Sequence, residues 1–158
     1  MRNPGNTCLV VAGCCSVCIA LLHAAVTIGG GDWYRLMVPG ETMAVMAEAG
    51  PWFPIMFTTA VILIFLLFGL YAFSGAGLIR RLPFTTGALI LISCVYLTRR
   101  VGSIPLILFV EQPYLSDMTT RIGFVFVSSV FSLIIGVLYG IGTLSHGLNG
   151  DGTKSHDT

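Results

Sequence analysis

The sequence predicts an all-α membrane protein in which four transmembrane helices form an antiparallel bundle, with a short interfacial helix between the first and the second. The first reason is composition: hydrophobic residues make up 55% of the 158 residues and charged residues only 9%, whereas soluble domains carry about 25% charge. The second reason is the presence of four apolar runs, at residues 8–29, 52–78, 83–104 and 122–144. Each run has at least the length of about 20 residues with which a helix crosses a bilayer core.

The four spans and their connections account for residues 1–146 and predict a single membrane domain. The remaining residues, 147–158, are polar and contain several glycines, a composition typical of a disordered tail. The net charge of the chain is +1. This balance argues against a nucleic-acid partner, because such a partner requires clustered basic residues.

The first span, residues 8–29, is interpreted as a retained helix. A signal peptide has an apolar core of about 7–15 residues, and this run is longer. Residues 11–14 read VAGC and resemble a lipoprotein cleavage box, but few apolar residues precede them. Four of the five cysteines lie in this span, where a thiol serves as a small apolar packing group.

Residues 32–50 are predicted to form an interfacial cap between the first two spans. Trp33 and Tyr34 belong to the residue types that settle at the level of the lipid head groups. Residues 41–49 are helix formers, and Pro51 ends them because proline disfavours helical geometry in the residue before it. We expect this segment to lie along the membrane surface over the outer end of the bundle.

The second and third spans are joined by the short link 79–84 and must therefore form an antiparallel hairpin. Basic residues in short loops prefer the cytoplasmic side of a membrane. They divide four to two, with Arg2, Arg80, Arg81 and Lys154 on one side and Arg35 and Arg121 on the other. This bias predicts that both termini are cytoplasmic. It becomes a tie if Arg99 and Arg100 are counted on the outer side.

Small residues recur at every fourth position along one face of the first and fourth spans. They are Ala12, Ser16, Ala20 and Ala24 in the first span and Ser128, Ser132, Gly136 and Gly140 in the fourth. In lipid, helices associate through close backbone approach at small residues, because apolar area alone gives them no reason to meet. We expect these stripes to pack helices within one chain, with dimerisation as the alternative.

Two adjacent arginines, Arg99 and Arg100, interrupt the third span. If the helix begins at Pro83, a rise of 1.5 Å per residue puts Arg99 about 24 Å along the axis. This depth is near the outer edge of the hydrocarbon, where a long side chain reaches the interface. Neighbouring helical residues point about 100° apart. One arginine is therefore expected to face inward and to pair with Glu48 or Asp32.

The predicted ligand site is an outward-facing polar cluster for an anionic or zwitterionic ligand or a lipid head group. Its members are Asp32, Glu41, Glu48, Tyr96, Arg99, Arg100 and His23. Two alternatives remain for the arginine pair: it only fixes the depth of the helix, or it belongs to a proton or ion pathway. His23 is expected either in this cluster or hydrogen-bonded inside the bundle. A haem shared with His146 is not expected, because the two histidines are predicted at different depths.

The chain resembles a set of small four-helix inner-membrane proteins of bacteria in five segments, WYR, GETMA, AEAGPWFP, LYAFSGAGLIRRLP and VYLTRR. The resemblance extends over residues 22–108, and its most characteristic piece is YAFSGAGLIRRLP at residues 71–83. It implies a bacterial origin and a multi-pass membrane protein, and it transfers no catalytic residue. It also implies that the hairpin at 71–83 and one arginine after Tyr96 belong to the shared design.

The sequence favours a non-enzymatic membrane component, meaning an accessory, assembly or ligand-binding protein. Its expected partners are membrane lipid and either further copies of itself or another membrane protein. A small oligomeric transporter subunit is the first alternative, and a membrane-embedded enzyme acting on lipid or quinone is the second. The polar residues of the spans gather at one end, whereas a transporter requires polar residues through the full depth. No Ser/His/Asp set, zinc spacing or phosphate loop appears, so no cofactor or metal is expected.

Overall fold

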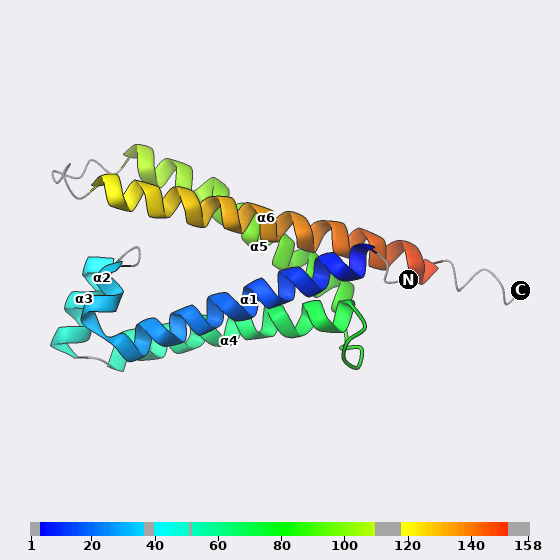
Figure 1. Ribbon diagram of the computed structural model, residues 1–158, viewed down its shortest axis with the longest axis horizontal. Coiled ribbons are helices and arrows are strands. Elements are labelled where there is room, and N and C mark those ends of the chain that lie inside the picture. The colour runs from blue at the N-terminus through cyan, green and yellow to red at the C-terminus, as the bar shows by residue number, and fades with distance from the viewer. Residues whose placement is uncertain (1–3, 37–39, 51, 110–117, 152–158) are drawn as a thin grey trace, which may run out of the picture. The chain divides into compact units, whose positions relative to one another are not determined.

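The computed structural model describes residues 4–36, 40–50, 52–109 and 118–151, and the side chains of residues 4–35, 43–50, 52–98 and 126–145. Throughout these ranges the regular secondary structure is helical (Figure 1). The helices are α1 (Pro4–Gly29), α2 (Gly31–Leu36), α3 (Gly40–Ala49), α4 (Trp52–Gly75), α5 (Thr85–Phe109) and α6 (Met118–Asp151).

Three helices are long and apolar enough to cross a membrane: Pro4–Gly29, Trp52–Gly75 and the Phe126–Ser145 part of α6. At most 33% of the residues in each apolar window are buried within the protein, so most of each span is available to lipid. The all-helical class is thereby confirmed, and three of the four predicted spans coincide with helices that are long and apolar enough to cross a membrane. In α5 the described apolar stretch is the shorter Thr85–Thr98, about 21 Å at 1.5 Å per residue. The fourth span, at residues 83–104, stays a prediction.

The chain forms two compact units, one built from residues 1–13 and 70–158 and the other from residues 14–69. Helices α1 and α4 contribute residues to both units. The helical backbone of α6 continues to Asp151, past residue 146, and residues 152–158 lie outside the described residues.

The core of the first unit is formed where glycines let three helices approach Leu9 of α1. Leu9 and Leu89 of α5 are both fully buried. A Cβ built on Gly75 of α4 would lie 2.8 Å from Leu89 Cδ1 and 3.1 Å from Leu9 Cδ1. One built on Gly142 of α6 would lie 2.6 Å from Leu9 Cδ2. Because these distances leave no room for a side chain, glycine is what permits the close approach.

Helices α5 and α6 lie side by side in the same unit (Figure 1). Tyr96 of α5 stacks on Tyr139 of α6, with ring centroids 5.8 Å apart. The Ser93 hydroxyl donates a hydrogen bond of 2.9 Å to the Gly136 carbonyl oxygen. This bond connects the two helices and satisfies a hydroxyl that would otherwise be costly in an apolar surrounding.

The turn between α4 and α5 begins with a glycine at the helix end. Gly77 has a φ of +74°, and its N–H donates to the Ser74 carbonyl while the Leu78 N–H donates to that of Phe73. These two bonds form the Schellman motif, in which a residue with positive φ, usually glycine, ends a helix. The second predicted span, 52–78, therefore ends at Gly75.

In the second unit, α2 and α3 pack together as a small hairpin, which we call the cap (Figure 1). Its core consists of Val26 from α1, Tyr34 and Ala44, all buried. The Tyr34 hydroxyl lies 3.0 Å from Thr58 Oγ1 and 3.5 Å from the Pro54 carbonyl oxygen, both on α4. The cap is therefore hydrogen-bonded to a membrane span.

Candidate functional site

The cap begins with a reversal of the chain at Gly30. Its φ is +70°, which glycine adopts without the steric penalty of a Cβ. The Gly30 N–H still bonds to the Val26 carbonyl of α1, while the Gly30 carbonyl accepts from the Trp33 and Tyr34 N–H groups of α2. One residue thus ends the first span and starts the next helix. The Trp33 indole lies over the Cα of Gly29, where a side chain would collide with it.

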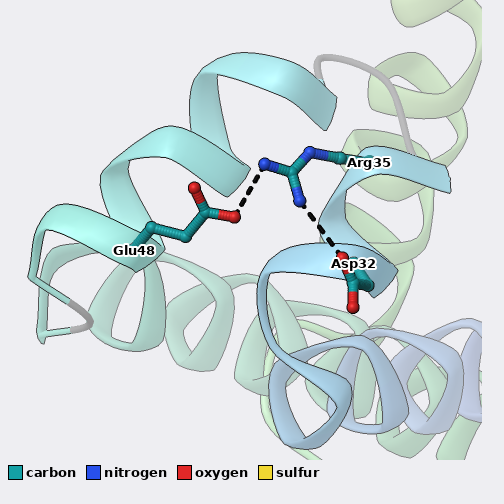
Figure 2. Close-up of polar contacts among 3 residues, drawn as sticks. All are labelled: Asp32, Arg35 and Glu48. Atoms are coloured by element: carbon teal, nitrogen blue, oxygen red, sulfur yellow. Dashed lines mark hydrogen bonds and ion pairs between the residues drawn. The ribbon is translucent and has the colours of Figure 1, made fainter.

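A cluster of three charged residues lies on this cap: Asp32 and Arg35 of α2 and Glu48 of α3 (Figure 2). Arg35 Nη1 donates to Asp32 Oδ1 at 3.1 Å, and Arg35 Nη2 donates to Glu48 Oε1 at 2.7 Å. The first pair has the i, i+3 spacing of neighbours on one helix face. The second pair connects the two helices. We call these three residues the cap cluster.

The cap cluster faces solvent or the membrane surface rather than a core. The side chains of Asp32, Glu48 and Arg35 are 93%, 55% and 37% exposed. Exposed ion pairs of this kind typically contribute about 0–1 kcal/mol each to stability. With two carboxylates and one guanidinium, the cluster carries a formal charge of −1. Its acceptor oxygens are open to a ligand, and stability alone gives little reason to assemble it.

Gly31 allows Glu48 to approach α2. A Cβ on Gly31 would lie 3.1 Å from Glu48 Oε1 and 3.5 Å from Glu48 Cγ. Distances of this size require a neighbour to move by a few tenths of an ångström. A side chain at residue 31 would therefore press on the Glu48 carboxylate and shift it slightly relative to Arg35.

Apolar side chains are exposed where α3 of the cap leads into α4. A shallow, open depression is lined by Met46, Ala49, Gly50, Trp52 and Phe53. Trp52 is 68% exposed and Phe53 47%, and tryptophan is typical of the boundary between lipid and water.

The sequence suggests Met43, Val45, Met46 and Ala47 as the membrane face of the cap. In the structure Val45 and Met46 are exposed, whereas Met43 and Ala47 pack on the cap core. Met43 and Ala47 are four residues apart and therefore lie on one side of the helix. Val45 and Met46 cannot both lie on that same side.

The structure brings two of the predicted ligand residues together, Asp32 and Glu48, and it joins them through Arg35. The sequence argument used Arg35 only in the charge count. The missed signal is the i, i+3 spacing of Asp32 and Arg35 within one short helix. Glu41, Arg99 and Arg100 lie outside the residues whose side chains are described, so the proposed pairing of Arg99 stays a prediction.

The other two predicted ligand residues lie among apolar groups. Tyr96 belongs to the first unit, where it is 3% exposed and stacked on Tyr139. His23 Nδ1 lies 2.8 Å from the Ile19 carbonyl oxygen of its own helix, and its ring packs on Phe65 with centroids 5.5 Å apart. Because a carbonyl only accepts hydrogen bonds, Nδ1 carries the proton in this arrangement.

The small-residue stripes lie mostly in packed positions. On α1, Ala12, Ser16 and Ala20 are buried and Ala24 is half-buried. On α6, a Cβ at Gly136 would lie 3.2 Å from Tyr96 Cβ, and one at Gly140 would lie 3.5 Å from Ser93 Oγ, so both face α5. The Ser132 hydroxyl donates to the Ser128 carbonyl, 2.9 Å away, within its own helix.

All five cysteines are free thiols. Among the described residues, no group of three or more His, Cys, Asp or Glu side chains is placed to hold a metal ion.

Three candidate spans and a cap bonded to one of them define the class of this chain, a helical multi-pass membrane protein. No protein-family model matches the sequence, and comparisons with curated proteins and with solved structures found no match either.

Proposed function

We propose that this protein is a non-enzymatic component of a bacterial inner membrane whose cap binds a zwitterionic phospholipid head group. The observation that carries the proposal is the cap cluster, an exposed triad of one guanidinium and two carboxylates, together with an open apolar depression where α3 of the cap leads into α4. The charges would recognise the head group, and the depression would take up apolar parts of the lipid.

The charges of the cluster complement a head group that contains both a phosphate and an ammonium. A guanidinium suits phosphate, because its planar fork offers several parallel N–H donors. Asp32 is almost fully exposed and contacts Arg35 through Oδ1, which leaves Oδ2 facing outward as an acceptor for an ammonium. The formal charge of −1 favours a ligand that brings a positive group over one that carries only negative charge.

The position of the cap in the chain supports contact with lipid. The cap lies between α1 and α4, both of which are candidate membrane spans, so it adjoins the membrane boundary. Exposed aromatic residues of the kind that settles at the head-group level lie on the cap, at Trp33, and at the start of α4, at Trp52 and Phe53. A lipid whose head group reaches the charged triad would place its glycerol and upper acyl carbons among these rings.

The polar groups inside the spans support an accessory role over conduction. Three hydroxyls donate to carbonyl oxygens one turn back along their own helices, from Thr27 to His23, from Ser132 to Ser128 and from Thr143 to Tyr139. A hydroxyl used in this way satisfies its donor locally. Hydroxyls bonded in this way serve the structure of their helices, which supports an accessory role.

The experiment measures the thermal midpoint of the detergent-solubilised full-length protein with added phosphatidylethanolamine or phosphatidylglycerol. We expect phosphatidylethanolamine to raise the midpoint of the wild type, and Arg35→Gln to abolish most of this rise. Arg81→Gln is the matched control, because it removes one exposed arginine away from the cap and should retain the response. A phosphatidylethanolamine response that Arg35→Gln leaves intact would disprove the proposal.

A further inference from the structure

The turn between α4 and α5, residues 76–84, exposes both large apolar and cationic side chains. Phe84 is 89% exposed, Leu78 50% and Ile79 39%. Arg80 and Arg81 are exposed beside them, and the turn contains no acidic residue. A loop surrounded only by water gains nothing from presenting three large apolar side chains. The combination matches the boundary of a bilayer, where apolar groups enter the hydrocarbon and cations meet phosphates.

The backbone of this turn is held by specific hydrogen bonds. The buried Ser74 hydroxyl accepts from the Leu82 N–H at 2.9 Å and donates to the Arg80 carbonyl at 3.3 Å. The Thr85 hydroxyl donates to the Leu82 carbonyl at 2.6 Å. The two arginines therefore extend from a fixed loop, and binding through them requires little ordering of the backbone.

Phe84 occupies a backbone conformation that is unfavourable for its residue type. Its φ is +57°, in the left-handed region where a Cβ is disfavoured. Glycine or asparagine would be the ordinary choice at such a position. Strained backbone of this kind gathers at functional positions, and here it accompanies the most exposed apolar side chain of the turn.

We infer that the 76–84 turn is a docking site for anionic phospholipid. Arg80 and Arg81 contact lipid phosphates, while Leu78, Ile79 and Phe84 enter the acyl boundary. The turn follows α4, a candidate span, and precedes the apolar Thr85–Thr98 stretch of α5, so both of its ends adjoin an apolar helix. Two cations in a turn that itself contains no acid favour net negative head groups, in contrast to the mixed charges of the cap cluster.

The chemistry favours lipid over free phosphate. Inorganic phosphate could pair with Arg80 and Arg81, but it offers nothing to the exposed apolar side chains. An anionic phospholipid satisfies both halves of the surface at once. Each basic residue near an anionic membrane surface contributes about a fivefold gain in affinity. Removal of both charges should therefore weaken binding by about 30-fold.

The test measures binding of phosphatidylglycerol, phosphatidylethanolamine and inorganic phosphate to the purified full-length protein by native mass spectrometry, together with the thermal midpoint. We expect phosphatidylglycerol to bind the wild type and the Arg80→Lys/Arg81→Lys variant. The Arg80→Gln/Arg81→Gln variant should lose this binding and retain the phosphatidylethanolamine response of the cap. Arg35→Gln should show the opposite pattern, so failure of one proposal is distinguishable from failure of the other.

A second variant tests the apolar half of the surface. Phe84→Gly removes the side chain and relieves the positive φ, so the protein should be at least as stable as the wild type in detergent alone. Its phosphatidylglycerol binding should nevertheless fall. The inference is overturned if Arg80→Gln/Arg81→Gln retains phosphatidylglycerol binding, or if Phe84→Gly binds phosphatidylglycerol as well as the wild type does. It is also overturned if inorganic phosphate raises the thermal midpoint as much as phosphatidylglycerol does.

Discussion

Arg35 is the residue on which the candidate site depends, because it contacts the carboxylates of both cap helices (Figure 2). Its contribution to stability is limited, because exposed ion pairs lie in a high dielectric and lose side-chain entropy when they form. Its value to the protein is geometric. The guanidinium holds the Asp32 and Glu48 carboxylates near one another, and so connects α2 with α3.

For the packing of the first unit, Leu9 has the central position that Arg35 has in the candidate site, since three helices converge on the Leu9 side chain. The Gly142→Ala substitution tests this arrangement. The new methyl group would meet Leu9 and would lie 3.2 Å from the Gly5 carbonyl oxygen. Overpacking of this kind typically costs about 1–3 kcal/mol, so we expect a clearly lower thermal midpoint in detergent.

Gly87→Ala is the matched control for that substitution. No atom lies within 4 Å of a Cβ built on Gly87, and alanine in a helix is favoured over glycine by about 0.5–1 kcal/mol. The control should equal or exceed the wild type in stability. Equal midpoints for the two variants would mean that the contact between Leu9 and Gly142 carries no packing energy.

Individual residues show where sequence reasoning stops. The sequence predicts Asp32 and Glu48 as site residues, because an inward-facing arginine of the third span requires an acid nearby. Arg35 is their partner in the structure, and the i, i+3 spacing points to Arg35 as a partner of Asp32 but does not connect it with Glu48. The distance between Glu48 and Arg35 depends on how α2 folds against α3, and a side chain at residue 31 would change it slightly. No composition or periodicity encodes that contact.

At the scale of elements, the cap is the part that differs most from its prediction. The expected interfacial segment, residues 32–50, is two helices, α2 and α3. Their apolar residues are shared between a small core around Tyr34 and an exposed face. A short apolar run is equally compatible with either role. The choice is made by the tertiary contact with α4, which the sequence does not reveal.

The Tyr34→Phe substitution tests how the cap is held. It removes the hydroxyl that contacts Thr58 and Pro54. A hydrogen bond of this kind typically contributes about 0.5–1.5 kcal/mol net to the free energy of unfolding. Thr58 is then free to bond the Pro54 carbonyl one turn back in its own helix, so the global midpoint should fall only slightly. We expect the clearer change in amide hydrogen exchange, with faster exchange across α2 and α3.

The control for the cap experiment is Tyr71→Phe, which alters a half-buried tyrosine of α4 outside the cap. It should leave exchange in α2 and α3 at the wild-type rate. Unchanged exchange in Tyr34→Phe would show that the hydroxyl does not hold the cap, and that the small apolar core alone does so.

At the scale of the whole molecule, the apolar runs predicted the class of protein well, because the 20-residue length is imposed by the bilayer. The ends of the elements were less predictable. The span expected at 52–78 ends at Gly75 because Gly77 forms a Schellman turn, and the one expected at 122–144 belongs to a longer helix, Met118–Asp151. Local hydrogen bonds determine where such helices end, and the distribution of apolar residues does not indicate these bonds.

The orientation in the membrane is tested by labelling single cysteines from outside the cell, in a background without native cysteines. Helix α4 runs from the cap to the 76–84 turn, and a helix that crosses the bilayer puts its ends on opposite sides. The basic turn predicts that Glu48→Cys reacts with an impermeant reagent and that Arg81→Cys does not. Reaction at residue 81 alone would reverse the topology.

The low burial of the spans has a consequence for how such a protein can change over time. About two thirds or more of the residues in each apolar window are not buried within the protein. Most positions therefore require only an apolar side chain, and neutral substitutions should accumulate quickly there. Stringent selection should be confined to a few buried sites such as Leu9, Gly75 and Gly142. Deep mutational scanning should therefore reveal long tolerant stretches interrupted by isolated intolerant glycines.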